Sequence, residues 1–138
     1  MAHPEMDALL DEALHVAVHF LEKNGEFFPF GVTMTEDGKI NHAQAWTGEE
    51  HPGSDAVIDH LVAGFAQGAK RGDYRATALA SDVRLSLDGA NQTDAIRVTI
   101  EHCQDEPVTC YLPYVNREGS FDFGELVAVR ADRFVFLH

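Results

Sequence analysis

The chain is poor in cysteine, in proline and in positive charge. Its 138 residues include two cysteines, five prolines and one tryptophan. Cys103 and Cys110 are too few for a disulfide framework and lack the paired spacing of a zinc site. No apolar run approaches membrane-spanning length, and the N-terminal residues lack the basic stretch and apolar core of a signal peptide. These absences predict a cytoplasmic protein that has no membrane partner.

The scarcity of positive charge also excludes a class of partner. The chain carries 23 acidic and 10 basic residues, a net charge of −13. Residues 1–69 hold 12 of the acids and only two lysines, which gives this half a charge of −10. Nucleic-acid binding begins with neutralisation of phosphates by lysine and arginine, so we expect no nucleic-acid partner. The acidic surface serves solubility, or it attracts a basic partner or a cation.

What the chain does have is a series of segments whose hydrophobic period changes along the sequence. Gly64 and Gly68, four apart in the second helical segment, would allow close packing on a sheet. The expected elements are a helix at 6–23, strands at 28–36 and 39–46, a helix between Ser54 and Gly72, and strands at 74–87, 94–103, 108–115 and 125–137, with a loop at 113–124. We therefore predict one α+β domain over residues 1–138, with two helices packed on an antiparallel sheet of five to six strands in the order α-β-β-α-β-β-β-β.

The turn of the first hairpin sets which side chains share a face of the sheet. Asp37-Gly38 suits a two-residue turn, which places Val32 opposite Ala43. Val32 and its neighbours at alternate positions then face the core. In the same register His42 lies beside Thr33 on the outer face, which we expect to be solvated.

The later hairpin contains the only cysteine and histidine that we expect to meet. A three-residue turn at 105–107 places His102 opposite Cys110 on the core face and puts Cys103 on the other face, so the cysteines are not bonded to each other. A thiolate beside an imidazole is a candidate nucleophile. Nothing upstream offers an oxyanion hole or an orienting acid, which favours a buried structural cysteine beside a hydrogen-bonded histidine.

The element order resembles that of roadblock and profilin-like domains, in which helices cover a five-stranded antiparallel sheet. The resemblance covers most of the chain and implies the fold alone, and the last element is expected to be a strand where roadblock domains have a helix. The segment Leu21–Gly31, followed by Asp37-Gly38, is similar to small bacterial α+β proteins with no assigned activity. This second resemblance spans the first third of the chain and implies no chemistry.

Two groups of residues have the composition of a metal site. His15 and His19 are four apart on the first helix and are flanked by Glu12 and Glu22, but the zincin motif needs a glutamate after its first histidine, and here that residue is valine. A second group gathers near the end of the first hairpin and in the loop that follows: His42, Glu49, Glu50 and His51. Solvated surface is the favoured interpretation of both groups, and we expect no metal or other cofactor.

The outer sheet face is the expected place for a ligand or a partner protein. Arg97 and Tyr111 project from it, together with further polar and charged side chains, Arg84, Glu101 and Thr109. Alternating charge across strands is typical of a solvated sheet face, although it also suits an interaction surface. Trp46, the sole tryptophan, lies near a strand end, where it packs at the edge of the core or contacts a partner.

No pattern in the sequence has the spacing of a known catalytic or cofactor motif. We therefore expect a non-catalytic interaction or regulatory module that binds itself as a homodimer or binds another protein. The alternatives are a small-ligand sensor with a pocket between the sheet and the helices, and an uncharacterised enzyme that uses His102 and Cys110.

Overall fold

The computed structural model describes residues 3–44, 53–86 and 92–137 and shows the predicted α+β fold. Its elements are α1 (Pro4–Asn24), β1 (Phe30–Thr35), β2 (Ile40–Ala43), α2 (Ser54–Arg71), β3 (Tyr74–Ser86), β4 (Gln92–His102), β5 (Asp105–Arg117), β6 (Ser120–Phe123) and β7 (Val127–Arg130). The predicted order of elements is confirmed, and within these described ranges the antiparallel sheet has seven strands where five to six were expected. No helix in the described ranges is long and apolar enough to cross a membrane.

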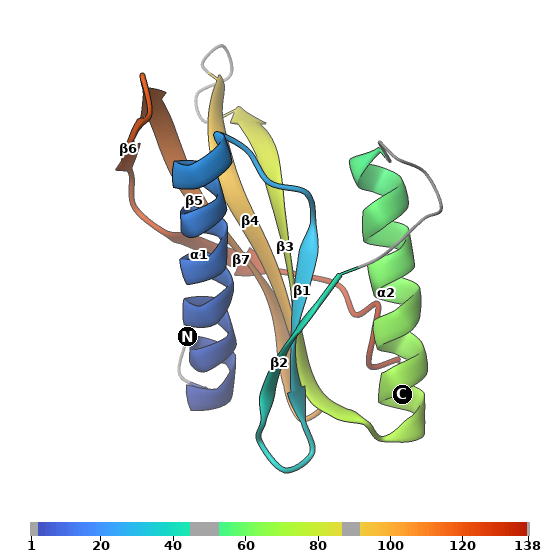
Figure 1. Ribbon diagram of the computed structural model, residues 1–138. Helices are drawn as coiled ribbons and strands as arrows, with labels where there is room; N and C mark the ends of the chain where they lie inside the picture. Colours follow the sequence, from blue (N-terminus) through green and yellow to red (C-terminus); the bar gives the residue numbers. More distant parts are fainter. Residues whose placement is uncertain (1–2, 45–52, 87–91, 138) are drawn as a thin grey trace.

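The sheet lies between the two helices, with α1 on one face and α2 on the other (Figure 1). Its strand order is β2-β1-β3-β4-β5-β6, and β7 pairs with β5 along the same side as β6. Each helix carries one apolar stripe and buries it against its own face of the sheet. The prediction of a solvated outer face is therefore wrong for the part that α2 covers.

The α1 face holds the larger core. α1 begins with Pro4 in its first turn and ends at Asn24, where the following Gly25 adopts a left-handed φ of 80°. The buried stripe of the helix packs on alternate residues of the central strands. On β3 these are Ala76, Ala78 and Ala80, whose small side chains allow the helix to lie close to the sheet.

The α2 face holds a smaller core, in which two aromatic rings pack directly against glycine residues. A side-chain carbon added at Gly31 of β1 would lie 2.2 Å from the ring of Phe65. One added at Gly68 of α2 would lie 2.2 Å from the ring of Tyr74. The close packing predicted for α2 is thus confirmed at Gly68, whereas Gly64 faces open space.

The first hairpin has a three-residue turn, and this shifts its register. The amide of Gly38 donates to the carbonyl of Thr35, and Gly38 has a φ of 90°, as in a type I turn closed by a left-handed glycine. The resulting register places Val32 opposite His42. The predicted register is wrong by one residue, so His42 lies on the α1 face, where its Nε2 is 3.1 Å from a carboxylate oxygen of Glu12.

The second hairpin is also paired differently from the prediction. A two-residue turn at Cys103-Gln104 pairs His102 with Asp105 and leaves Cys110 opposite Val98. The expected pairing of His102 with Cys110 is wrong. It was chosen by matching the faces of the two strands, and a hairpin that slips by an even number of residues keeps every side chain on its face. Both cysteines are free, as predicted, with Cys103 exposed and Cys110 buried.

The C-terminal part contains a further hairpin where a loop was expected. β5 continues to Arg117, and the turn Glu118-Gly119, whose two residues both have positive φ, leads into β6. Only β7 is a strand within the predicted segment 125–137. Beyond β7 the chain crosses to the α2 face (Figure 1), where Val135 and Phe136 join the smaller core.

Candidate functional site

A cleft of about 540 Å³ lies between α2, the sheet and the C-terminal segment. The wall formed by α2 is mainly apolar, the floor comes from alternate residues of three strands, and residues 131–135 close another side. The α2 wall consists of Ile58, Asp59, Val62, Ala63 and Phe65. The floor consists of Thr77, Leu79, Arg97, Thr99, Glu101, Thr109 and Tyr111.

Glu101 positions the C-terminal segment at the cleft. This residue is 3% exposed, and its carboxylate accepts the backbone amides of residues 134–136 at distances between 2.9 and 3.3 Å. Burial removes the water molecules that would otherwise bond to this carboxylate, and the backbone amides take their place. Arg133 adds a second attachment, since its guanidinium donates to the carbonyl of His102 at 3.0 Å. A charged residue of β4 therefore fixes one side of the cleft.

Arg97 and Tyr111 face each other across neighbouring strands of the floor. The Nε of Arg97 donates to Ser81 Oγ at 3.2 Å. The next pair along the strands is Thr99 and Thr109, whose hydroxyl oxygens are 3.3 Å apart. The cleft thus offers a mainly apolar wall opposite a floor of hydroxyls, the Arg97 guanidinium and the Glu101 carboxylate, which backbone amides already occupy.

The structure brings most of the predicted outer-face residues together in this cleft. Arg97, Glu101, Thr109 and Tyr111 all line it. Arg84 lies outside the lining, and its Nε is 3.5 Å from Asp94 Oδ1. The role of Arg97 and Tyr111 in binding a ligand or a partner stays a prediction.

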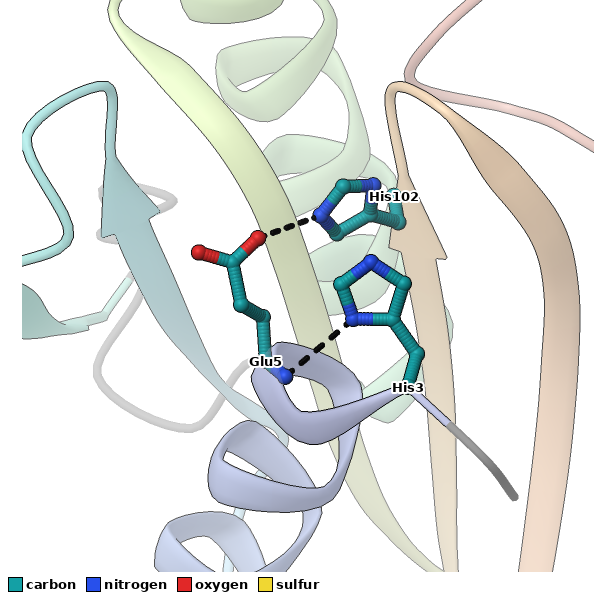
Figure 2. Close-up of side chains that lie close together, drawn as sticks. All are labelled: His3, Glu5 and His102. Atoms are coloured by element: carbon teal, nitrogen blue, oxygen red, sulfur yellow. Dashed lines mark hydrogen bonds and ion pairs between the residues drawn. The ribbon is translucent and has the colours of Figure 1, made fainter.

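A second cluster of titratable groups joins the start of α1 to the end of β4 (Figure 2). His102 Nε2 lies 2.8 Å from one carboxylate oxygen of Glu5, and Arg75 donates to the other at 2.6 Å. The Nδ1 of His3 accepts the amide of Glu5 and so caps the helix. The bonds from His102 and Arg75 lower the pKa of Glu5, and Glu5 in turn raises the pKa of the Arg75 guanidinium.

The geometry of this cluster differs from that of a metal site. His3, Glu5 and His102 offer ligand atoms within 4.8 Å of one another. However, His102 Nδ1 accepts the amide of Gln104, so the ring proton lies on Nε2 and is donated to Glu5. A metal-bound histidine has the reverse arrangement, with its remaining N–H given to an acceptor. The cluster is better described as a set of hydrogen bonds that joins α1 to the sheet.

The remaining candidates from the sequence do not converge in one place. His15 and His19 are exposed on α1, and among the described residues no third ligand joins them. Glu12, expected beside them, contacts His42 instead. Four candidates lie outside the described residues: Trp46, Glu49, Glu50 and His51.

The sequence carries a signal for α2 on the second face of the sheet, in line with the expected alternative of a pocket between the sheet and the helices. α2 has a complete apolar stripe, and α1 alone accounts for one face of the sheet, so the second stripe required the other face. For the contact between Glu5 and His102 there was no local signal, because 97 positions separate the two residues.

Comparisons with known proteins leave the family open, since no family model, no curated protein and no solved structure matches the chain. The resemblance to roadblock and profilin-like domains therefore stays a prediction from element order.

Proposed function

We propose that this chain is a small-ligand-binding module whose site is the cleft between α2 and the sheet. The observation that carries the proposal is a space of about 540 Å³ with an apolar wall and a polar floor. Binding sites for small molecules are concave and mostly apolar, with a few polar groups that orient the ligand.

The chemistry of the lining favours binding over covalent catalysis. Within the described chain, the residues that line the cleft include no histidine and no cysteine. His102 is bonded to Glu5 near the start of α1, and Cys110 belongs to the core on the α1 face. Burial raises the pKa of the Cys110 thiol, which keeps it protonated and poorly nucleophilic.

Fragment screening by NMR tests the proposal directly. A library of neutral and charged fragments is added to the isotope-labelled chain, and amide shifts are mapped onto the structure. We expect shifts at the floor strands and at α2. Ala63→Trp places a large ring in the cleft and should abolish them, whereas His60→Trp alters an exposed position of the same helix outside the lining and should preserve them.

The result that would overturn the proposal is a wild-type chain in which no fragment shifts a cleft residue. Shifts that survive Ala63→Trp would place the binding site elsewhere and have the same consequence. Thermal unfolding of both variants establishes that each is folded before its spectra are compared.

A second candidate function, a homodimeric interaction module, is favoured by the sheet edge that β6 and β7 form. β7 pairs only with β5 among the described strands, so its other side offers backbone groups to a strand of another chain. Five large apolar side chains along this edge are 39–47% exposed: Val115, Phe123, Leu126, Val127 and Val129.

Sedimentation of the wild type against the double variant Val127→Lys, Val129→Lys tests this edge. A dimer that dissociates in the variant supports the second candidate, because lysines on an edge strand oppose strand pairing. A wild type that is monomeric at every accessible concentration contradicts it and leaves the cleft proposal unchanged.

A further inference from the structure

Arg97 differs from most other arginines of this chain in its partners. Four arginines form ion pairs with carboxylates: Arg71 with Asp73, Arg75 with Glu5, Arg84 with Asp94, and Arg117 with Asp122. Arg133 donates to backbone carbonyls, and Arg130 is exposed on β7. Arg97 is half-buried on the cleft floor, and its only hydrogen bond within the described residues runs from Nε to Ser81.

The terminal nitrogens of Arg97 therefore have no carboxylate partner in the described chain, although acids outnumber bases 23 to 10 overall. Glu101 is the acid on the same strand and face, but four residues of strand separate the two Cα atoms by about 13 Å. The carboxylate of Glu101 is already occupied by the amides of residues 134–136. A guanidinium fixed through Nε, with its NH₂ groups unpaired at a cleft, matches the geometry that recognises an oxyanion.

Resting on the function proposed above, we infer that the ligand is a small organic acid with a single carboxylate and an apolar body. The carboxylate binds the NH₂ groups of Arg97. The apolar body lies against Val62 and Phe65 on the α2 wall. Tyr111, directly opposite Arg97, and the nearby Thr99 add hydroxyl groups for a polar substituent.

Charge at the cleft favours a singly charged acid over a phosphate monoester. Asp59 and Asp132 are both exposed members of the lining. Their carboxylates repel a dianion more strongly than a monoanion, and Arg97 is the only basic residue of the described lining. A carboxylate and a phosphate share the guanidinium contact, so the experiment must distinguish them.

Three probes of equal chain length separate these possibilities: octanoate, octanamide and octyl phosphate. Their affinities are measured by NMR titration of the wild type, Arg97→Gln, Arg97→Lys and Arg84→Gln. Arg84→Gln is the matched control, since it removes an arginine of the neighbouring strand that lies outside the lining. We expect octanoate to bind the wild-type cleft more tightly than the other two probes.

Arg97→Gln should weaken octanoate at least about tenfold, as expected for a lost charge-assisted contact, and leave octanamide unchanged. Arg97→Lys should retain part of the affinity, and Arg84→Gln should retain all of it. Equal affinity of octanoate and octanamide, or an octanoate affinity that Arg97→Gln does not change, overturns the inference while the cleft remains a ligand site. Preferential binding of octyl phosphate assigns the guanidinium to a phosphate and also overturns it.

The titrations also distinguish a failure of the carboxylate inference from a failure of the proposed function. If none of the three probes shifts a cleft residue, but other neutral fragments do, the carboxylate inference falls alone. If no compound of any charge shifts the cleft, the proposed function falls with it.

Discussion

His102 shows that the direction of hydrogen bonds, as well as proximity, decides what a histidine can do. Its side chain is 3% exposed and lies between an amide donor at Nδ1 and a carboxylate acceptor at Nε2. Those two partners fix one neutral tautomer. A ring held in this way joins two elements and is poorly placed to accept a proton from a nucleophile.

The acid sensitivity of folding should depend on Glu5. The pKa of Glu5 is lowered in the folded chain. At pH values above its ordinary pKa of 4.5, the ionised carboxylate therefore stabilises the fold. This stabilisation is lost as the pH falls from that value through the folded-state pKa. Urea unfolding from neutral pH downward should show that Glu5→Gln lacks this part of the pH dependence.

The quantity to compare is the slope of the free energy of unfolding against pH. Its absolute value is not informative, since Glu5→Gln also lowers stability at neutral pH by weakening the contacts to His102 and Arg75. Parallel pH profiles for the wild type and the variant would show that Glu5 is not the responsible carboxyl. His42→Gln is a suitable control, because it changes an exposed histidine–glutamate contact between β2 and the same helix.

Replacement of the two exposed histidines of α1 should change little. His15→Gln with His19→Gln is expected to shift the free energy of unfolding by no more than about 0.5 kcal/mol, as for other exposed positions away from special features. Chemical denaturation with and without a chelator measures this. A larger loss, or a metal that leaves with the histidines, would mean that the exposed ridge is a binding site.

The C-terminal segment is the element whose position depends most on one side chain. Glu101→Gln keeps the shape of the side chain but removes the charge and one of the two acceptor oxygens. We expect a loss of about 1–3 kcal/mol, the cost of an unsatisfied buried group, and faster hydrogen exchange at residues 134–136. Glu106→Gln, at an exposed position of β5, should leave both measurements unchanged. Unchanged exchange in Glu101→Gln would contradict the proposed attachment.

The packing of α2 should respond in opposite ways to alanine at its two central glycines. Gly68→Ala forces a carbon to within 2.2 Å of the Tyr74 ring and should destabilise the fold by about 1–3 kcal/mol. Gly64→Ala meets open space and should stabilise the helix by up to about 1 kcal/mol. Urea midpoints of the two variants on the same side of the wild type would contradict the packing described here.

Sequence patterns predict where these elements lie, but they do not predict the turns that set the registers of the hairpins. Alternation and helical period correctly located both helices and the strands β1 to β5. They could not fix the registers, because Gly38 closes either a two-residue or a three-residue turn. Face matching around His102 is likewise satisfied by any register that differs by an even number of residues. The expected pairing of His102 with Cys110 was wrong for this reason.

At the scale of the whole molecule, the fold class could be predicted because the order of helices and strands leaves few arrangements. The lining of the cleft could not, because it needs two contributions that no local pattern reports: Arg97 and Tyr111 in the same register, and residues 131–135 crossing back from β7. The strand pattern placed Arg97 and Tyr111 on one face of the sheet, but it did not show whether that face is solvated or is a binding surface.

The charge of the whole chain predicts how it behaves toward polyanions. With a net charge of −13, it should show no saturable binding to duplex DNA or RNA at physiological salt, because few phosphates can be neutralised. Fluorescence anisotropy with labelled duplexes measures this. Binding that weakens steeply with added salt would reveal a basic surface that the described arginines do not form.

The long separation of Glu5 from His102 has a consequence during translation. α1 leaves the ribosome well before β3 and β4, the strands that cover its apolar stripe, and Glu5 meets its histidine partner only 97 positions later. The α2 core waits longer still, for Val135 and Phe136. Nascent chains of intermediate length therefore carry an uncovered amphipathic helix, which exposes apolar surface to aggregation until the later strands are made.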